Sequence, residues 1–165
     1  MEEEKGIAKE NPEYYTGLKT ILWEFQEHLI SSGIIKNNDY ESYIGLLEQI
    51  RMDDKKEFDI TYNLSDALEG LIQHLNNDGL SVKSSIIGNK YFNYTDSKSF
   101  LFNQKMSELI AKKEDLNRST LANVILQVYD EKDFELPLIK LKIFRFLDPN
   151  SDNIMYIYAG RPSPE

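Results

Sequence analysis

Two histidines, His28 and His74, are the only imidazoles in the chain that could ligate a metal ion or act as a general base. Glu24 and His28 lie four residues apart, so on a helix they would share one side and could bind a metal ion together. A carboxylate-bridged di-metal site needs Glu-x-x-His on more than one helix, and no Asp or Glu here has His three residues later. We therefore interpret Glu24 and His28 as a solvated helix face, and His74 as a residue that supports a helix end.

Other catalytic signatures are missing from the sequence. The chain has no cysteine, which excludes disulfides, thiolate metal sites and cysteine nucleophiles. It has no Gly-x-Ser-x-Gly elbow, and none of its eight glycines forms Gly-x-Gly, which disfavours serine hydrolase chemistry and the common phosphate loops. We predict no catalytic residue and no cofactor, and we lean towards a protein that is not an enzyme.

One short segment could bind a hard cation. Asp148, Asn150 and Asp152 stand at the first, third and fifth positions of a segment that resembles the opening of a calcium loop. Its twelfth position is Ala159 rather than the bidentate Glu that such a loop requires. Asp, Pro, Asn and Ser are also common turn formers, so we favour a plain hairpin loop and predict no metal site.

Aromatic and acidic residues near the C-terminus suggest a protein-contact surface, since tyrosine and phenylalanine are enriched at interfaces. The acidic connector, residues 130–135, could attract a basic partner, although such a run is more often simply solvated. The aromatic residues could instead complete the core, which is the more common fate of any single one. The predicted contact residues are Phe144, Phe146, Tyr156, Tyr158, Asp130, Glu131 and Asp133.

The composition narrows the classes of partner. The chain has 165 residues, a net charge of −9, and 41% hydrophobic and 12% aromatic residues, which argues for one folded domain. No dense cluster of Lys and Arg is present, so we predict neither nucleic acid nor an anionic membrane surface as a partner. No apolar run approaches the ~20 residues of a membrane-spanning helix.

Helical periodicity places five helices along the chain. Apolar residues recur at three- and four-residue spacing, and Asp39, Asn63 or Ser65, Asp96, and Asn117 or Ser119 precede four of the segments as candidate N-caps. Gly33 and Gly79 stand where two of the helices should stop. The expected helices cover about residues 13–32, 40–52, 65–75, 97–113 and 120–129.

The remaining apolar segments indicate strands. Residues 58–62 alternate apolar and polar side chains, and residues 80–94 indicate one or two irregular strands. Ile139, Leu141 and Ile143 alternate with lysines, and residues 154–158 are aromatic or apolar, so residues 138–158 predict a β-hairpin. The fold class is then α+β, with about five helices packed on a small antiparallel sheet. The alternative is a mostly α fold in which Pro137 starts a buried helix over residues 137–147.

We expect a mobile acidic tail over residues 1–12, a single globular domain over residues 13–160, and a short tail over residues 161–165. The function favoured by the sequence is protein–protein interaction with an unknown partner. One alternative is an extracytoplasmic domain, periplasmic or lipid-anchored, whose anchor has been removed; a native start at Met1 would instead make the protein cytoplasmic. Another alternative is a small-ligand binder or enzyme with an unfamiliar site.

Overall fold

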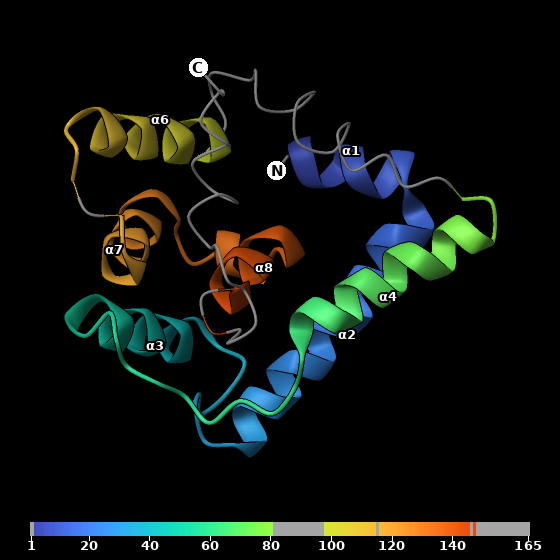
Figure 1. Cartoon of the computed structure of the whole chain (residues 1–165), viewed down its shortest axis with the longest axis horizontal. Helices are drawn as coiled ribbons and strands as arrows, with labels where there is room; N and C mark the ends of the chain where they lie inside the picture. The colour runs from blue at the N-terminus through green and yellow to red at the C-terminus, as the bar shows by residue number, and fades with distance from the viewer. Residues whose placement is uncertain (1, 81–97, 115, 146, 148–165) are drawn as a thin grey trace.

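The computed structural model describes residues 2–80, 98–114, 116–145 and 147, and all the regular secondary structure in these residues is helical (Figure 1). No β-strand occurs in this part of the chain. The described helices form one small domain. In chain order they are α1 (Glu2–Glu10), α2 (Pro12–Ser31), α3 (Tyr40–Met52), α4 (Leu64–Asn77), α6 (Lys98–Ala111), α7 (Arg118–Val128), the short 3-10 helix η1 (Asp133–Glu135) and α8 (Pro137–Arg145).

The predicted α+β class is therefore wrong, and the mostly α alternative fits the structure. The first predicted strand of the hairpin is helix α8. Ile139, Ile143 and Phe144 are fully buried, and no described residue of α8 is exposed. A helix buried on every side carries apolar residues all round its axis, so its sequence does not show a one-sided helical stripe. Periodicity alone cannot separate such a helix from a strand.

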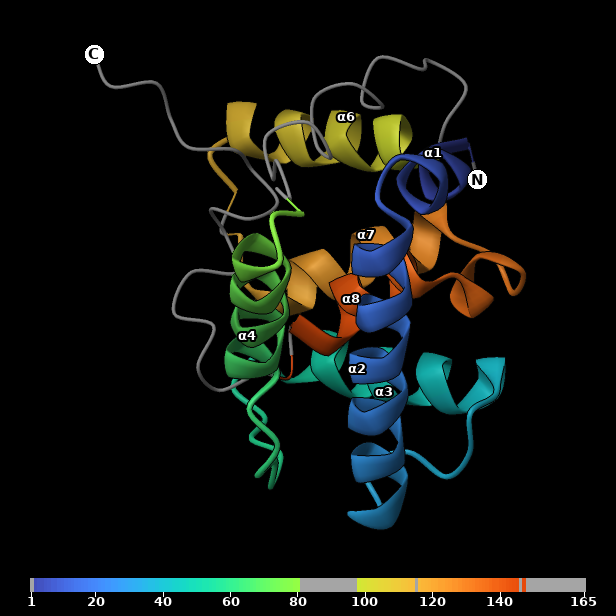
Figure 2. The same cartoon turned by 90° about the vertical axis from the view of Figure 1, so that its right-hand side faces the viewer.

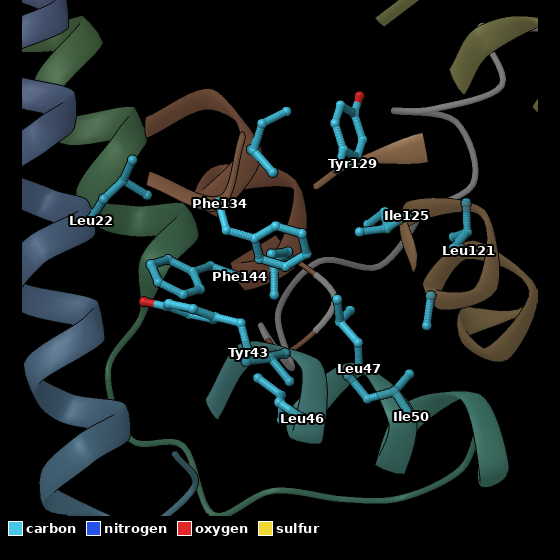
Figure 3. Close-up of a cluster of buried hydrophobic side chains, with 14 of the residues drawn as sticks. Leu22, Tyr43, Leu46, Leu47, Ile50, Leu121, Ile125, Tyr129, Phe134 and Phe144 are labelled. Atoms are coloured by element: carbon cyan, nitrogen blue, oxygen red, sulfur yellow. The ribbon is translucent and has the colours of Figure 1, made fainter. Parts of the chain in front are cut away.

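Helix α8 lies at the centre of the molecule, with α2 and α4 on one side and α3 and α7 on the other (Figures 1 and 2). The buried core surrounds it. Phe25 of α2 and Tyr43 of α3 meet the ring of Phe144 with centroids 5.0 Å and 6.1 Å away. Figure 3 shows this cluster, with side chains from α2, α3, α7 and α8 converging on one apolar region.

Local signals set the ends of several helices as predicted. The side chains of Asp39, Asn63 and Asn117 accept backbone hydrogen bonds at the starts of α3, α4 and α7. Gly33 and Gly79 follow α2 and α4 with φ of +69° and +75°, a conformation that glycine adopts without steric cost. The five helices expected from periodicity correspond to α2, α3, α4, α6 and α7.

Helices α2 and α4 pack closely, and Gly17 makes this possible. A Cβ atom at Gly17 would lie 2.4 Å from Cδ1 of Leu71 on α4. Real Cβ atoms do not approach other atoms so closely, so any larger residue would force Leu71 to move. A side chain at position 17 would therefore disturb this contact between α2 and α4.

The strand expected over residues 58–62 is also wrong, although its pattern has a structural cause. Phe58, Ile60 and Tyr62 are half-buried and pack on the core, while Asp59 and Thr61 are exposed. The segment thus alternates its side chains as a strand does. A β-strand also needs a second strand to pair with its backbone, and none is present among the described residues.

The N-terminal segment forms helix α1 where the sequence suggests a mobile tail. Ile7 is buried with 1% of its surface exposed, and Glu4 is buried with 4% exposed. The carboxylate of Glu4 accepts hydrogen bonds from the Tyr15 hydroxyl at 3.1 Å and from the Leu138 amide at 3.4 Å. Glu4, one of the acidic residues that suggest a tail, is therefore a buried part of the fold.

Two other strand predictions lie outside the described residues. These are residues 81–94 of the irregular strand region and residues 154–158 of the hairpin.

Candidate functional site

A pocket of about 450 Å³ opens where the start of α3 faces the segment that joins α7 to α8. We call it the connector pocket, because this segment includes the acidic connector, residues 130–135. Helix α8 contributes one residue to its floor. The lining residues are Asn38, Asp39, Tyr40, Tyr43, Glu131, Phe134, Glu135 and Lys140.

Four side chains form a hydrogen-bond network at the floor of the connector pocket. The Tyr43 hydroxyl lies 2.8 Å from Oε1 of Gln26 and 3.1 Å from Oδ1 of Asn38. Lys140 Nζ donates to the same two oxygen atoms, each at 3.0 Å. Figure 3 shows the Tyr43 hydroxyl directed towards α2, the helix that carries Gln26. Because Gln26 is only 4% exposed, the network is anchored in the core.

Lys140 is a half-buried cation whose charge is only partly compensated. Burial lowers the pKa of Lys140, and the charge of Glu135 acts in the opposite direction. The Lys140 ammonium also lies 5.6 Å from the centre of the Tyr43 ring, a distance at which a cation is attracted to the ring. Neither of its two hydrogen-bond acceptors carries a charge. Within the described residues, no carboxylate lies within ion-pair distance of Lys140.

The rim of the connector pocket is acidic. Asp39, Glu131 and Glu135 are all exposed, and they come from two segments about ninety residues apart in the chain. Hydrogen bonds from Ser42, followed by one from Asn37, hold the pKa of Asp39 below its usual range. Among the described residues of the lining, three carboxylates thus face one ammonium group, and their net charge is negative.

Aromatic rings make one wall of the connector pocket. Tyr40 and Phe134 meet edge to face with centroids 5.1 Å apart, and Tyr43 and Phe134 have centroids 6.3 Å apart. Phe134 is buried and Tyr40 is half-buried. Such rings offer a surface for the aliphatic stem and the charge of a lysine or arginine side chain.

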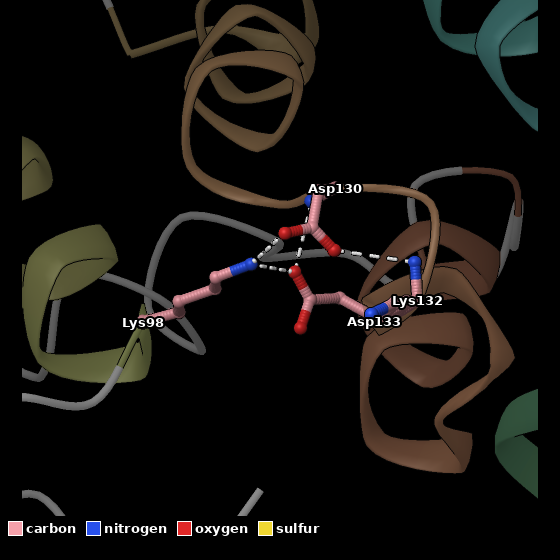
Figure 4. Close-up of polar contacts among 4 residues, drawn as sticks. All are labelled: Lys98, Asp130, Lys132 and Asp133. Carbon is pink, nitrogen blue, oxygen red and sulfur yellow. Dashed lines mark hydrogen bonds and ion pairs between the residues drawn. The ribbon is translucent and has the colours of Figure 1, made fainter.

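An ion-pair cluster fixes the acidic connector beside the pocket (Figure 4). Lys98 at the start of α6 pairs with Asp130 at 2.6 Å and also with Asp133, whose side chain is almost fully buried. The Asp130 amide donates to Asp133 Oδ2 at 2.8 Å, and the Lys132 amide donates to Asp130 Oδ1 at 3.2 Å. The hydrogen bond from Lys98 holds the pKa of Asp130 below its usual range. The cluster thus engages two of the connector's acids, while Glu131 lines the pocket.

The predicted contact residues differ in their burial. Phe144 is fully buried in the core, so it cannot belong to an exposed contact surface. Asp133 is also buried, while Asp130 and Glu131 are exposed. The other predicted residues lie outside the described part of the chain: Phe146, Tyr156 and Tyr158 of the contact surface, and Asp148, Asn150 and Asp152 of the calcium candidate.

Four polar residues of the connector pocket were not predicted from the sequence: Gln26, Asn38, Tyr43 and Lys140. In the sequence, Tyr43 is only one of the apolar residues of the helix expected over residues 40–52. Lys140 is one of the lysines on the outer face of the expected strand. Asp39 is identified as a helix cap, without any hint of a pocket. No local signal could bring these four residues together, because they come from α2, the start of α3 and α8.

Glu24 is exposed and His28 is partly exposed on α2, and both also hold a loop. Tyr62 donates its hydroxyl hydrogen bond to Glu24 Oε2 at 2.9 Å, and the Thr61 amide donates to His28 Nε2 at 3.2 Å. Burial, followed by the hydrogen bond to Glu24, raises the pKa of Tyr62 to about 12. The pair therefore fixes the segment that leads into α4.

A second hollow of about 500 Å³ runs along α6 and α7. Its lining mixes three cations, Arg51, Lys105 and Lys112, with two acids, Glu108 and Glu114. Arg51 pairs with Glu48 at 2.6 Å, and Lys105 donates to Gln127 at 3.3 Å. The described lining of the connector pocket carries three acids against one cation and includes an aromatic wall, so we consider it the better candidate site.

The described residues contain neither a metal-binding cluster nor a membrane-spanning helix. No group of three or more Asp, Glu and His residues in this part of the chain is arranged to hold a metal ion. None of the described helices is both long enough and apolar enough to cross a bilayer.

Comparison with known proteins adds no functional information: no protein-family model, curated protein or solved structure matches this chain. The geometry of the connector pocket is therefore the basis for the functional proposal.

Proposed function

We propose that this protein is a non-enzymatic interaction domain and that its connector pocket docks a basic segment of a partner protein. The observation that carries the proposal is the gathering of Asp39, Glu131 and Glu135 on the rim of one pocket beside an aromatic wall. Opposite charges speed the encounter of two proteins and disfavour partners of the wrong charge. The net charge of −9 acts in the same direction.

The bonds that hold the walls and floor of the pocket support this role. The Lys98 cluster holds the connector, and the Gln26 network holds the floor. A binding surface that is ordered before the partner arrives loses less conformational entropy on binding. The aromatic wall adds a cation–π contribution of about 0.5–1 kcal/mol at an exposed site.

The test is affinity capture from the native host with three immobilised proteins. These are the wild type, a pocket variant with Glu131→Lys and Glu135→Lys, and a charge-matched control with Glu27→Lys and Glu57→Lys, two exposed acids away from the pocket. We expect a partner that binds the wild type and the control, is lost with the pocket variant, and dissociates as salt is raised. Recovery of the same proteins with the pocket variant, or of none with the wild type, would count against the proposal.

A second candidate function is the binding of a small ligand in the same pocket. The hollow lies within the volume range of ligand sites, and the polar atoms of Tyr43, Asn38 and Lys140 converge at its floor. Calorimetric titration with small amines and amino acids tests this candidate, and heats that vanish in the pocket variant would favour it over a protein partner.

A further inference from the structure

Among the described residues, Lys140 has no charged partner within ion-pair distance, although the other charged residues that line its pocket are acidic. Its ammonium group has three N–H donors, and the structure gives it two neutral amide oxygens as acceptors. Buried charges in proteins are normally paired, because removing an ion from water is costly. Burial shifts the pKa of Lys140 downwards, as expected for a cation without a close counter-ion. A ligand with a negative group would supply the missing partner.

The rim restricts which anions can reach Lys140. A lone anion would pass three carboxylates, Asp39, Glu131 and Glu135, that outnumber the single ammonium of the pocket. An anion that arrives with a positive group beside it avoids this repulsion, because the positive group can contact the rim while the anion contacts the floor. The charges therefore favour a ligand that carries both signs a short distance apart.

We infer that the connector pocket captures the carboxy-terminal end of a partner chain, with the terminal carboxylate on Lys140 and a basic side chain close to the terminus on the acidic rim. This inference rests on the proposed function and specifies the segment that docks. A hollow of about 450 Å³ suits the end of a chain better than the surface of a folded domain. Capture of a terminal carboxylate is a recurrent mode of peptide recognition.

The experiment uses fluorescently labelled pentapeptides and anisotropy titration of the full chain. One peptide has two arginines next to its last residue and a free carboxylate. The second has the same sequence with an amidated end, and the third replaces both arginines by serine and keeps the free carboxylate. We expect the first peptide to bind at least ~10-fold more tightly than each of the others, which corresponds to about 1.4 kcal/mol.

Variants of the chain assign the two halves of the contact. Lys140→Met should remove the preference for the free carboxylate and leave binding of the amidated peptide in place. Lys140→Arg keeps the charge and should retain part of the preference for the free carboxylate. A preference that survives in the Arg variant and is lost in the Met variant depends on the charge at this position. Lys132→Met, which removes an exposed lysine of the connector, should leave the preference unchanged.

The outcomes separate this inference from the proposed function. Equal binding of the free and amidated arginine peptides would overturn the inference and leave the proposed function standing. Failure of both peptides to bind would refute the two together. Persistence of the carboxylate preference in Lys140→Met would overturn the inference as well. If free arginine displaced the labelled peptide as effectively as the unlabelled peptide does, the occupant would be a small zwitterion and the inference of a chain end would be overturned.

Discussion

Replacement of Glu4 tests whether the N-terminal helix is part of the fold. Helix α8 begins with Pro137, which has no backbone N–H, and Leu136 before it has no side-chain acceptor. The first free donor is the amide of Leu138, and Glu4 supplies its acceptor from 134 residues away. Glu4 thus does the work of an N-cap, and its negative charge lies at the positive end of the α8 dipole.

The expected loss of stability follows from these two contributions. A charge at a partly buried helix end contributes up to about 2 kcal/mol, and a hydrogen bond to a charged group about 1.5–3 kcal/mol. Glu4→Gln keeps an acceptor and loses the charge, so it should lower the free energy of unfolding by about 1 kcal/mol. Glu4→Ala loses both and should lower it by about 2–3 kcal/mol. For a chain of this size, each kcal/mol shifts Tm by about 2–4 °C.

Urea unfolding followed by circular dichroism at 222 nm measures these changes. Glu27→Gln and Glu27→Ala are the matched controls, because Glu27 is an exposed residue of a helix, and they should change the free energy by no more than about 0.5 kcal/mol. A double-mutant cycle of Glu4→Gln with Tyr15→Phe should give a coupling of at least ~0.5 kcal/mol, since the two side chains share a hydrogen bond. If Glu4→Ala cost no more than Glu27→Ala, the reasoning about the α8 start would be refuted.

Three further predictions concern packing, pH and the ion-pair cluster. Gly17→Ala should destabilise the protein by forcing Leu71 to move, whereas Gly45→Ala adds a Cβ in open space and should stabilise it by about 0.5–1 kcal/mol; urea unfolding compares the two. Because the pKa of Tyr62 is raised to about 12, its stabilising effect should be fully present below pH 10 and be lost as pH rises from 10 to about 12. Unfolding measured across this range should show a shallower decline for Tyr62→Phe. Lys98→Met should cost about 1–2 kcal/mol in the same urea assay, because it leaves the carboxylates of the connector without their cation, and no loss would contradict this role.

Local chemistry made five helices predictable from the sequence. Asp39, Asn63 and Asn117 are correctly identified as N-caps, because a cap bonds to a backbone amide only a few residues away. Glycines with positive φ likewise mark the ends of α2 and α4 through their own conformation. Such features depend on neighbours in the chain and can be read without knowledge of the fold.

The errors arise where distant contacts decide the structure. Helix α1 has few large apolar residues. It is held partly by the hydrogen bond from Leu138 to Glu4, which no local sequence pattern predicts. The segment from Phe58 to Tyr62 has a strand's alternation because alternate side chains pack on the core, and at its end Tyr62 donates to Glu24 of α2. The rest of the connector pocket escapes prediction for the same reason, although its acidic rim is partly visible in the sequence through Glu131.

The two lysines of α8, Lys140 and Lys142, show that the same spacing places side chains differently in a strand and in a helix. In a strand, Lys140 and Lys142 would point to the same face. In a helix, two residues of separation correspond to a rotation of roughly 200°, so the two side chains diverge. Lys140 reaches the network at the floor of the connector pocket, whereas Lys142 lies 5.2 Å from the centre of the Phe102 ring on α6. A central helix has no single solvated side, so each lysine must extend its apolar stem past the core to a separate partner. For Lys140 that requirement places a cation at the floor of a pocket, where a ligand can reach it.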